Sequence, residues 1–275
     1  MKKILIGIVC GFVLVYVGFK LIKDSSHSLF FTKKDRITVV LYGKEPFLYS
    51  IGLSDGIDYA VPYSPDLKIL VPGGYKEYRV GALGKLNALE HKPDIYKRAF
   101  GLHTGSFVDF YFYSPSTEVF YGKTSSDRVP MLNWVNLLFF PSNASLADRI
   151  YLLSVFSKKS SHDFRLLSAE GDFATRFQGF FYQNRYRLEN KSVQILYTSY
   201  QAAETVNTIL EGSGIRVGDM TETDVHEPCT VRESSTPFSQ TASAISSYFN
   251  CRLTTGKTDI YDILFELGDK EKEWE

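Results

Sequence analysis

Residues 193–220 of the chain, VQILYTSYQAAETVNTILEGSGIRVGDM, decide how its C-terminal third folds. Residues 193–197 form a short apolar run that is typical of a β-strand. The apolar side chains that follow recur at helical spacing: Ala202, Ala203, Val206, Ile209 and Leu210. Gly212 and Gly214 end this helix, and residues 215–220 indicate a second strand. The stretch therefore predicts a β-α-β unit.

The elements that follow complete a domain over residues 187–275. A strand over residues 229–233 precedes a helix that Thr236 opens as N-cap, with Pro237 at the first helical position. That helix carries an apolar stripe of Phe238, Ala242, Ile245 and Phe249. Residues 260–267 form the last strand. The order β-α-β-β-α-β predicts a ferredoxin-like domain, with one sheet and two helices on one of its faces. Such a fold hosts many functions and specifies none by itself.

Cys229 and Cys251 both belong to this domain. The second helix runs antiparallel to the strand before it, so the start of the strand and the end of the helix lie at one edge. A disulfide is expected there; it would close a loop of about twenty residues and contribute about 3 kcal/mol on the loop-entropy model. Two buried thiols are the alternative. Neither cysteine has a histidine or acidic residue at a motif spacing, so no catalytic or zinc-binding role is predicted.

The N-terminus predicts a membrane anchor. Residues 4–19 contain no charge, and the apolar segment continues to Ile22, which is about the length that crosses a bilayer. Lys2 and Lys3 precede it and favour an orientation with the rest of the chain outside the cytoplasm. A cleaved signal peptide is the alternative, but no small-x-small cleavage site follows. We expect a single-pass protein of the cell membrane, anchored by residues 1–23.

A polar linker over residues 24–35 leads to a mixed α/β domain over residues 36–186, and a charged stretch over residues 185–191 marks its end. The expected strands cover residues 37–42, 47–51, 57–61, 67–71 and 107–112, and the expected helices cover residues 80–89, 95–100 and 146–156. The strand over residues 67–71 is expected to extend the sheet. Pro72-Gly73-Gly74-Tyr75 then breaks it as a turn, and Gly101 ends the second helix. The fold class is thus α/β (α+β), in two domains behind one anchor.

The composition excludes one class of partner. The chain is 44% hydrophobic and 23% charged, a globular balance, and its 31 basic residues are matched by 31 acidic ones. No basic block stands out, so nucleic acid is not an expected partner. The histidines are scattered without metal-ligand spacing, and no metal site is predicted from them: His27, His91, His103, His162 and His226.

The passages YAVPYSPDLKI (residues 59–69) and PGGYKEYRV (residues 72–80), followed by Gly101-Leu102 before a strand, resemble a LytR-CpsA-Psr domain. The C-terminal unit is similar to the LytR C-terminal domain in its opening Val-Gln-Ile strand and in its closing residues, Asp259-Ile260 and Leu267-Gly268. The resemblance implies an extracytoplasmic protein that transfers glycopolymers from a polyprenyl-phosphate carrier to the cell wall. It also implies arginines that hold the pyrophosphate, and an acidic residue with Mg²⁺.

The chain departs from this pattern at the residues that carry the chemistry. Pro65-Asp66 stands where the family has an arginine before the aspartate, and Gly43-Lys44-Glu45-Pro46 replaces the early aspartate and the Arg-x-Asp loop. No catalytic residue is therefore assigned, and no cofactor is expected, with Mg²⁺ required only by a transferase. The charged residues that remain are candidates for a residual anion or sugar-phosphate site, or else are ordinary solvated charges: Lys44, Asp66, Arg79 and Lys85.

Three hypotheses follow for the function. The leading one is a noncatalytic envelope protein whose domains bind or organise cell-wall polymer or envelope partners. The second is an active glycopolymer transferase of the LytR-CpsA-Psr type with relocated charged residues. The third is a structural or assembly subunit that binds other proteins.

Overall fold

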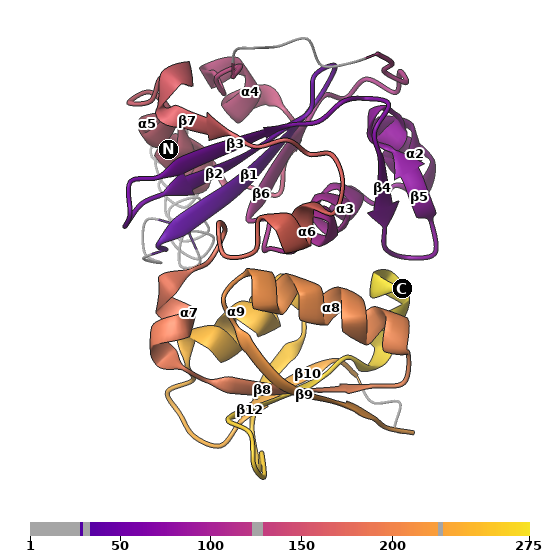
Figure 1. Cartoon of the computed structure of the whole chain (residues 1–275), viewed down its shortest axis with the longest axis vertical. Coiled ribbons are helices and arrows are strands. Elements are labelled where there is room, and N and C mark those ends of the chain that lie inside the picture. Colours follow the sequence, from indigo (N-terminus) through magenta and orange to yellow (C-terminus); the bar gives the residue numbers. More distant parts are fainter. Residues whose placement is uncertain (1–27, 30–33, 123–128, 225–227) are drawn as a thin grey trace, which may run out of the picture.

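Two α/β domains are stacked in the computed structural model, which describes residues 28–29, 34–122, 129–224 and 228–275 (Figure 1). Each domain has a five-stranded sheet, and helices of both domains lie between the two sheets. None of the helices in the described part of the chain is long and apolar enough to span a bilayer. The anchor predicted over residues 1–23 lies outside the described residues, as does most of the linker.

The central sheet has the strand order β6-β1-β2-β3-β7. Its strands are β1 (Arg36–Tyr42), β2 (Phe47–Gly52), β3 (Asp58–Pro62), β6 (Phe110–Tyr113) and β7 (Phe164–Leu166). The first three strands form an antiparallel meander, while β6 and β7 add parallel strands at its two edges. The strands β1 and β2 are buried along their whole length, which their near-continuous apolar sequence permits because both faces of the sheet are covered. The strands predicted within residues 37–61 are confirmed.

Helices cover both faces of this sheet. Alternate residues of β1 enter different cores: Val40 packs with α2 (Leu83–Glu90) and α3 (Asp94–Thr104), and Val39 packs with α4 (Trp134–Phe139) and α5 (Leu146–Phe156). The short helix α6 (Phe173–Arg176) lies beside α3 on the side that faces the second domain (Figure 1). The remaining short elements are η1 (Val80–Ala82), η2 (Ser161–Asp163), η3 (Gly268–Lys270), α7 (Asn184–Glu189) and α10 (Glu271–Trp274).

The prediction that residues 67–71 extend the central sheet is wrong. The strand β4 (Lys68–Val71) pairs only with β5 (Lys76–Arg79), and the two form a separate hairpin beside α3. The turn predicted between them is confirmed: Gly73 and Gly74 have φ values of +96° and +84°, which glycine adopts without strain, and they reverse the chain. The strand β5 was missed because its sequence, Lys-Glu-Tyr-Arg, has no apolar alternation.

Gly101 does not end the second helix of this domain. The helix α3 continues to Thr104 and ends at Gly105, which has a φ of +60°. Gly101 is needed for close packing instead, since a Cβ atom there would lie 2.6 Å from the Tyr248 hydroxyl oxygen of the other domain. The two glycines thus have different roles: Gly105 ends the helix, and Gly101 allows the interdomain contact.

The C-terminal sheet has the order β11-β10-β12-β8-β9, and it is not ferredoxin-like. Its elements are β8 (Ser192–Tyr197), α8 (Tyr200–Gly212), β9 (Arg216–Glu222), β10 (Thr230–Glu233), α9 (Gln240–Phe249), β11 (Arg252–Thr255) and β12 (Ile263–Glu266). A split β-α-β fold separates the parallel strands of each unit by another strand. Here β8 pairs directly with β9, and β10 pairs directly with β11. The short strand β11 was missed, and it completes a second unsplit β-α-β unit. The predicted last strand, β12, lies between the two units.

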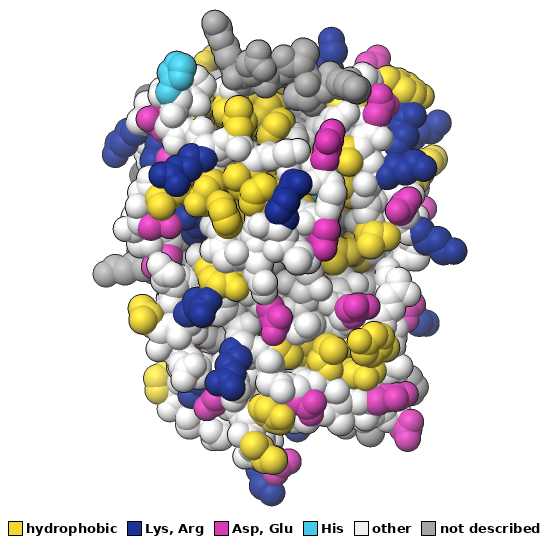
Figure 2. Space-filling model, viewed as in Figure 1, with side chains coloured by type: hydrophobic (Ala, Val, Ile, Leu, Met, Phe, Trp, Pro, Cys, Tyr) yellow, Lys and Arg dark blue, Asp and Glu magenta, His cyan; other side chains and the backbone are white. Residues whose placement is uncertain are grey.

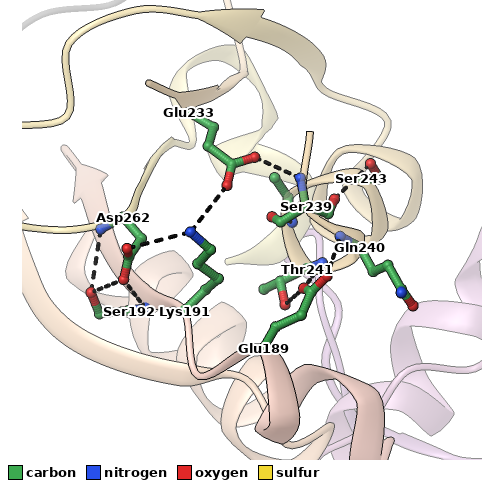
Figure 3. Close-up of polar contacts among 10 residues, drawn as sticks. Glu189, Lys191, Ser192, Glu233, Ser239, Gln240, Thr241, Ser243 and Asp262 are labelled. Carbon is green, nitrogen blue, oxygen red and sulfur yellow. Dashed lines mark hydrogen bonds and ion pairs between the residues drawn. The ribbon is translucent and has the colours of Figure 1, made fainter. Parts of the chain in front are cut away.

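The start of α9 also differs from the prediction. Its N-cap is Ser239, whose hydroxyl accepts a hydrogen bond from the Ala242 N–H, and not Thr236. The Glu189 carboxylate of α7 reaches the same helix end and accepts hydrogen bonds from the N–H groups of Gln240 and Thr241, each at 2.8 Å (Figure 3). A carboxylate is favourable there because the first N–H groups of a helix lack intrahelical partners. The connector α7 is thereby fixed to the C-terminal domain.

The disulfide between Cys229 and Cys251 is confirmed. Cys229 directly precedes β10, and Cys251 lies between α9 and β11. The two Cα atoms are 4.9 Å apart, which is within the ordinary range for a bridged pair. The bond closes the second β-α-β unit at the edge where its strand begins and its helix ends.

The two domains share a buried junction. Phe107 belongs to the central domain by sequence but packs in the C-terminal core, where its ring stacks on Tyr248 at 4.3 Å between centroids. Its N–H donates to the Ser213 hydroxyl at 2.8 Å. The C-terminal end of α8 approaches the end of α3 so closely that a Cβ atom on Gly212 would lie 1.7 Å from the Gly105 carbonyl oxygen. These contacts hold the domains as one unit. Figure 2 shows the two domains as one continuous body, with basic and acidic side chains interspersed over the face in view.

Lys97 of α3 makes the junction sensitive to pH. Its ammonium donates to the Tyr248 carbonyl oxygen at 2.6 Å and lies 3.9 Å from the centroid of the Tyr248 ring. Burial lowers the pKa of Lys97 to about 8; the carboxylates of Asp94 and Asp109 oppose this shift, and the charges of Lys34 and Arg98 add to it. The charged form is therefore disfavoured in the folded protein.

We expect the free energy of unfolding to rise between pH 8 and pH 10. In this range folded Lys97 loses its proton, while unfolded Lys97 keeps it up to its ordinary pKa of 10.5, so the penalty for burying the charge is relieved. The gain is roughly 2 kcal/mol, at about 1.4 kcal/mol per pH unit above the folded pKa. Urea unfolding of the native chain and of Lys97→Met measures it; equal pH slopes in the two chains would contradict the assignment.

Candidate anion-binding site

A cavity of about 370 Å³ opens where the β4–β5 hairpin, the start of α3 and the C-terminal helix α10 meet. The hairpin turn and the α2–α3 connection belong to the central domain, whereas α10 belongs to the C-terminal domain. The lining residues are Gly73, Tyr75, His91, Lys92, Pro93, Asp94, Arg98, Lys272 and Glu273. Cavities between domains are common places for ligands, because both sides contribute side chains to the lining.

Arg98 is the buried charge of this cavity. The residue is 6% exposed, and its Nη1 donates to the Glu273 carbonyl oxygen at 2.7 Å. Its Nε is buried and has no hydrogen-bond partner in the described part of the chain, and no carboxylate there lies within ion-pair distance of its guanidinium. A buried guanidinium without a counter-charge is unfavourable, so its environment favours an anion with oxygens that accept from it.

The sequence positions Arg98 through the apolar stripe of α3. Ile95, Tyr96, Ala99 and Phe100 are buried against the sheet, and Arg98 follows Ile95 by three residues on the same side of the helix. The hairpin turn then covers the guanidinium: a Cβ atom on Gly73 would lie 3.1 Å from Arg98 Nη1. Only glycine leaves room for this approach in the backbone conformation found there.

The end of the described chain closes the other side of the cavity. The successive N–H groups of Gly73 and Gly74 donate to the main-chain oxygen of Glu275, at 2.7 Å and 3.3 Å. Consecutive N–H groups in such a glycine turn form a concave binding surface for oxygen. The contact holds Glu273 beside Arg98, so that a main-chain oxygen rather than a carboxylate meets the guanidinium.

The acidic side chains at the cavity are engaged elsewhere. One Asp94 carboxylate oxygen accepts from the Tyr111 hydroxyl at 3.0 Å, and a Glu273 carboxylate oxygen pairs with Lys270 at 2.8 Å. The Tyr75 hydroxyl donates to Glu90; burial and this carboxylate raise the Tyr75 pKa, and the charge of Arg98 opposes the rise. Within the described residues, none of these carboxylates forms an ion pair with Arg98.

Exposed basic groups surround the opening. Lys92 lies between α2 and α3, and Lys272 lies in α10 of the other domain. His91 ends α2 with a left-handed backbone conformation and is also exposed. Three cationic side chains, two at the rim and one in the interior, line the cavity together with the carboxylates of Asp94 and Glu273. A guanidinium fork and ammonium groups together suit phosphate or carboxylate oxygens.

A second groove, of about 570 Å³, lies on the other side of the C-terminal segment. Its lining combines the apolar Leu70, Val71 and Leu102 with two acidic residues, Glu204 and Glu275. Its charged lining residues are Lys76, Glu204 and Glu275, and all three are exposed. It has no buried charge that matches Arg98.

The structure brings together two of the four charged residues selected from the sequence. Arg79 Nη2 lies 3.7 Å from an Asp66 carboxylate oxygen, and the guanidinium stacks over the Tyr121 ring at 4.3 Å. Asp66 also accepts from the Gly122 N–H at 3.0 Å. Asp66 is exposed, whereas Arg79 is half-buried, and its Nε and Nη2 have no hydrogen-bond partner in the described part of the chain. Neither residue lines the cavity around Arg98.

Lys44 and Lys85 are both exposed, Lys44 in the β1–β2 turn and Lys85 on α2. No hydrogen bond or ion pair within the described residues joins either lysine to Asp66 or Arg79. A phosphate or sugar-phosphate ligand for the four residues stays a prediction. Within the described residues, no three His, Cys, Asp or Glu side chains are grouped closely enough to hold a metal ion.

The space between the central sheet and α3 is filled by aromatic side chains. Tyr42, Tyr63, Tyr96 and Phe100 are fully buried there, and the rings of Tyr42 and Tyr96 are 4.7 Å apart between centroids. Tyr63 meets Phe100 edge to face at 4.8 Å. These side chains pack the layer between the central sheet and α3.

The cavity residues were missed in the sequence. Arg98, Lys92 and Lys272 come from segments as far apart as 180 residues, and only the folded chain brings them together. One local signal was present: Arg98 is a charge inside the apolar stripe of a predicted helix, where a buried position needs a partner. No such signal in the sequence indicated that the C-terminal segment lines the cavity.

The structure defines the chain as a two-domain α/β protein, and comparisons with known proteins do not narrow this class further. No family model and no curated protein matches the chain. Among solved structures, TagT of Bacillus subtilis is similar over 30% of this chain and 33% of its own, with 16% identity and a TM-score of 0.24. The B. subtilis transcriptional regulator yvhJ is similar over 50% of this chain and 83% of its own, with 8% identity and a TM-score of 0.33. The chain spans about a third of TagT. These TM-scores do not assign the chain to a family.

Proposed function

We propose that this chain is a noncatalytic, membrane-anchored envelope protein that binds an anionic cell-wall polymer in the cavity around Arg98. The observation that carries the proposal is the buried Arg98 guanidinium, whose Nε has no hydrogen-bond partner and which has no carboxylate partner within the described residues. An incoming phosphate or carboxylate group supplies both the missing acceptor and the counter-charge. The proposal keeps the sequence resemblance to LytR-CpsA-Psr proteins and assigns the chain a binding role among them.

A polymer fits the site better than a small anion does. Arg98 lies inside the cavity, and Lys92 and Lys272 lie at its rim on two different domains. A chain of repeated anionic units can place one unit on the buried guanidinium while its neighbours contact the rim. Several weak contacts along one chain then add to the affinity. The rim contacts are exposed, so we expect salt to weaken them.

Two further features support a binding protein outside the cytoplasm. The disulfide between Cys229 and Cys251 is the kind of bond that persists in oxidising compartments, in agreement with the predicted orientation of the anchor. The carboxylates at the cavity, Asp94 and Glu273, are occupied by Tyr111 and Lys270. A binding role requires neither of them to react.

Calorimetric titration of the full-length chain in detergent tests the function. The probes are a poly(glycerol phosphate) oligomer and an uncharged glucan of similar length. We expect saturable binding of the phosphate polymer, weakened by added salt, and no binding of the glucan. Equal binding of both probes, or binding of neither, would reject the proposal. Purification with a stoichiometric protein partner and no polymer binding would favour an assembly subunit instead.

A further inference from the structure

The outer face of α4 and α5 is unusually apolar for a surface. Trp134 and Phe139 of α4 are 58% and 70% exposed, and Leu146 and Ile150 of α5 are 56% and 50% exposed. The two helices contact each other, and they lie on the side of the central sheet away from the C-terminal domain (Figure 1). We call these four residues the outer apolar face. Large side chains gathered in this way mark an interaction surface.

The inner sides of the same helices already supply the core. Leu137 of α4 is fully buried, as is Leu152 of α5, and Phe156 packs edge to face on Tyr49 of the sheet. Arg149 donates to the carbonyl oxygens of Leu137 and Phe140 and so ties the two helices together. Because the core is complete without them, the residues of the outer apolar face are available to an external partner.

Ser28 and Leu29 contact the start of α5, one of the two helices that carry the outer apolar face. The Ser28 hydroxyl and the Leu29 N–H both donate to one carboxylate oxygen of Asp148, at 2.9 Å and 2.8 Å. Asp148 is in the first turn of α5, two residues after Leu146. Leu29 is itself buried in the core beneath these helices. The chain is therefore fastened at the start of α5, on the buried side of the helix, which is opposite to Leu146 and Ile150.

The length of the chain before Ser28 limits how far the membrane can be. Ser28 follows Ile22, the end of the apolar segment, by six residues. A chain extended over that interval reaches about 20 Å. If residues 1–23 cross the bilayer, the start of α5 can lie no farther than this from the point where the segment leaves the hydrocarbon region.

We infer that the outer apolar face of α4 and α5 rests on the lipid bilayer that holds the anchor. The inference depends on the membrane anchor of the proposed function and not on the anion site. Tryptophan suits the boundary between lipid and water, because one part of its ring system is apolar and its N–H is polar. Phe139, Leu146 and Ile150 add apolar area beside it. The C-terminal domain then points away from the membrane, toward the wall (Figure 1).

Tryptophan fluorescence tests this in liposomes that contain the full-length chain and lipids brominated in their acyl chains. The chain has two tryptophans, and Trp274 is 3% exposed in the C-terminal core, so it serves as an internal control. We expect brominated lipid to quench Trp134 emission at least about twofold, as for residues of a membrane-interface belt. Trp134→Phe should remove the quenching. Phe139→Ser should reduce it, and Leu188→Ser, which changes an exposed residue of α7 at the start of the C-terminal domain, should leave it unchanged.

Three outcomes separate the claims. Unquenched Trp134 in a chain that resists carbonate extraction overturns the lipid contact and leaves the anchor intact. Trp134 shielded from both brominated lipid and aqueous acrylamide overturns it in favour of a second copy on this face. A chain that carbonate extracts overturns both the anchor and the lipid contact. Binding of poly(glycerol phosphate) by the same preparation is judged independently of all three.

Discussion

Replacing Arg98 by methionine is expected to abolish most of the binding of the poly(glycerol phosphate) oligomer. The guanidinium is the one buried cation of the cavity, and its Nε has no partner within the described residues. A hydrogen bond to a charged group contributes about 1.5–3 kcal/mol, so the affinity should fall at least about tenfold. Calorimetric titration under the conditions used for the native chain measures the change.

The fold should survive this substitution. Methionine is unbranched and apolar, and it fills much of the volume of the arginine side chain. Removing an uncompensated buried charge relieves a penalty that offsets the lost bond to the Glu273 carbonyl oxygen. We therefore expect little change in the free energy of unfolding. A large loss of stability would mean that Arg98 serves the domain junction instead.

Arg79→Met is the matched control. Arg79 is also an arginine of the central domain, but it pairs with the exposed Asp66 and lies outside the cavity. We expect the Arg79→Met chain to bind the oligomer as the native chain does. The opposite result, lost binding in Arg79→Met and normal binding in Arg98→Met, would move the site to the residues selected from the sequence.

Gly212→Ala is expected to cause a large loss of stability. An added Cβ atom would lie 1.7 Å from the Gly105 carbonyl oxygen and 2.8 Å from its carbonyl carbon. Both atoms belong to the main chain at the end of α3, so no flexible side chain can move aside. Overpacking of this kind typically costs about 1–3 kcal/mol, and we expect a value near the upper end. Chemical denaturation measures it.

Gly43→Ala is the matched control, because it makes the same substitution at a position where the added methyl group has space. A Cβ atom at Gly43 would meet no atom within 4 Å. Its stability should stay within about 0.5 kcal/mol of the native value, as for other surface substitutions. Because the anion cavity spans the two domains, Gly212→Ala should also weaken polymer binding. Native stability in Gly212→Ala would contradict the close contact between α3 and α8.

Local sequence patterns predicted the elements of this protein better than their arrangement. Residues 193–220 produced β8, α8 and β9 with boundaries near those observed, because a strong apolar period and two glycines define them. The prediction of a ferredoxin-like arrangement was wrong because it omitted β11. This strand has only four residues, Arg-Leu-Thr-Thr, and little apolar signal. Its pairing with β10 is decided by the fold of the whole sheet. The prediction for β4 was wrong for a similar reason, because its partner β5 has no apolar alternation.

The candidate site was even less accessible from sequence. Lys44, Asp66, Arg79 and Lys85 were selected as the charged residues that remain where the sequence departs from the pattern that it resembles, and the structure joins only Asp66 and Arg79. The buried guanidinium of Arg98 depends on a glycine turn 25 residues earlier and on a helix near residue 273. Such a site arises only when distant segments pack together.

The most direct test of the central claim is a crystal structure of the protein soaked with glycerol phosphate. We predict a phosphate group in the cavity between α3 and α10, with a phosphate oxygen within hydrogen-bond distance of Arg98 Nε. The neighbouring positions should lie toward Lys92 and Lys272. Phosphate bound only on surface lysines, with Arg98 still bonded to the Glu273 carbonyl oxygen alone, would contradict it.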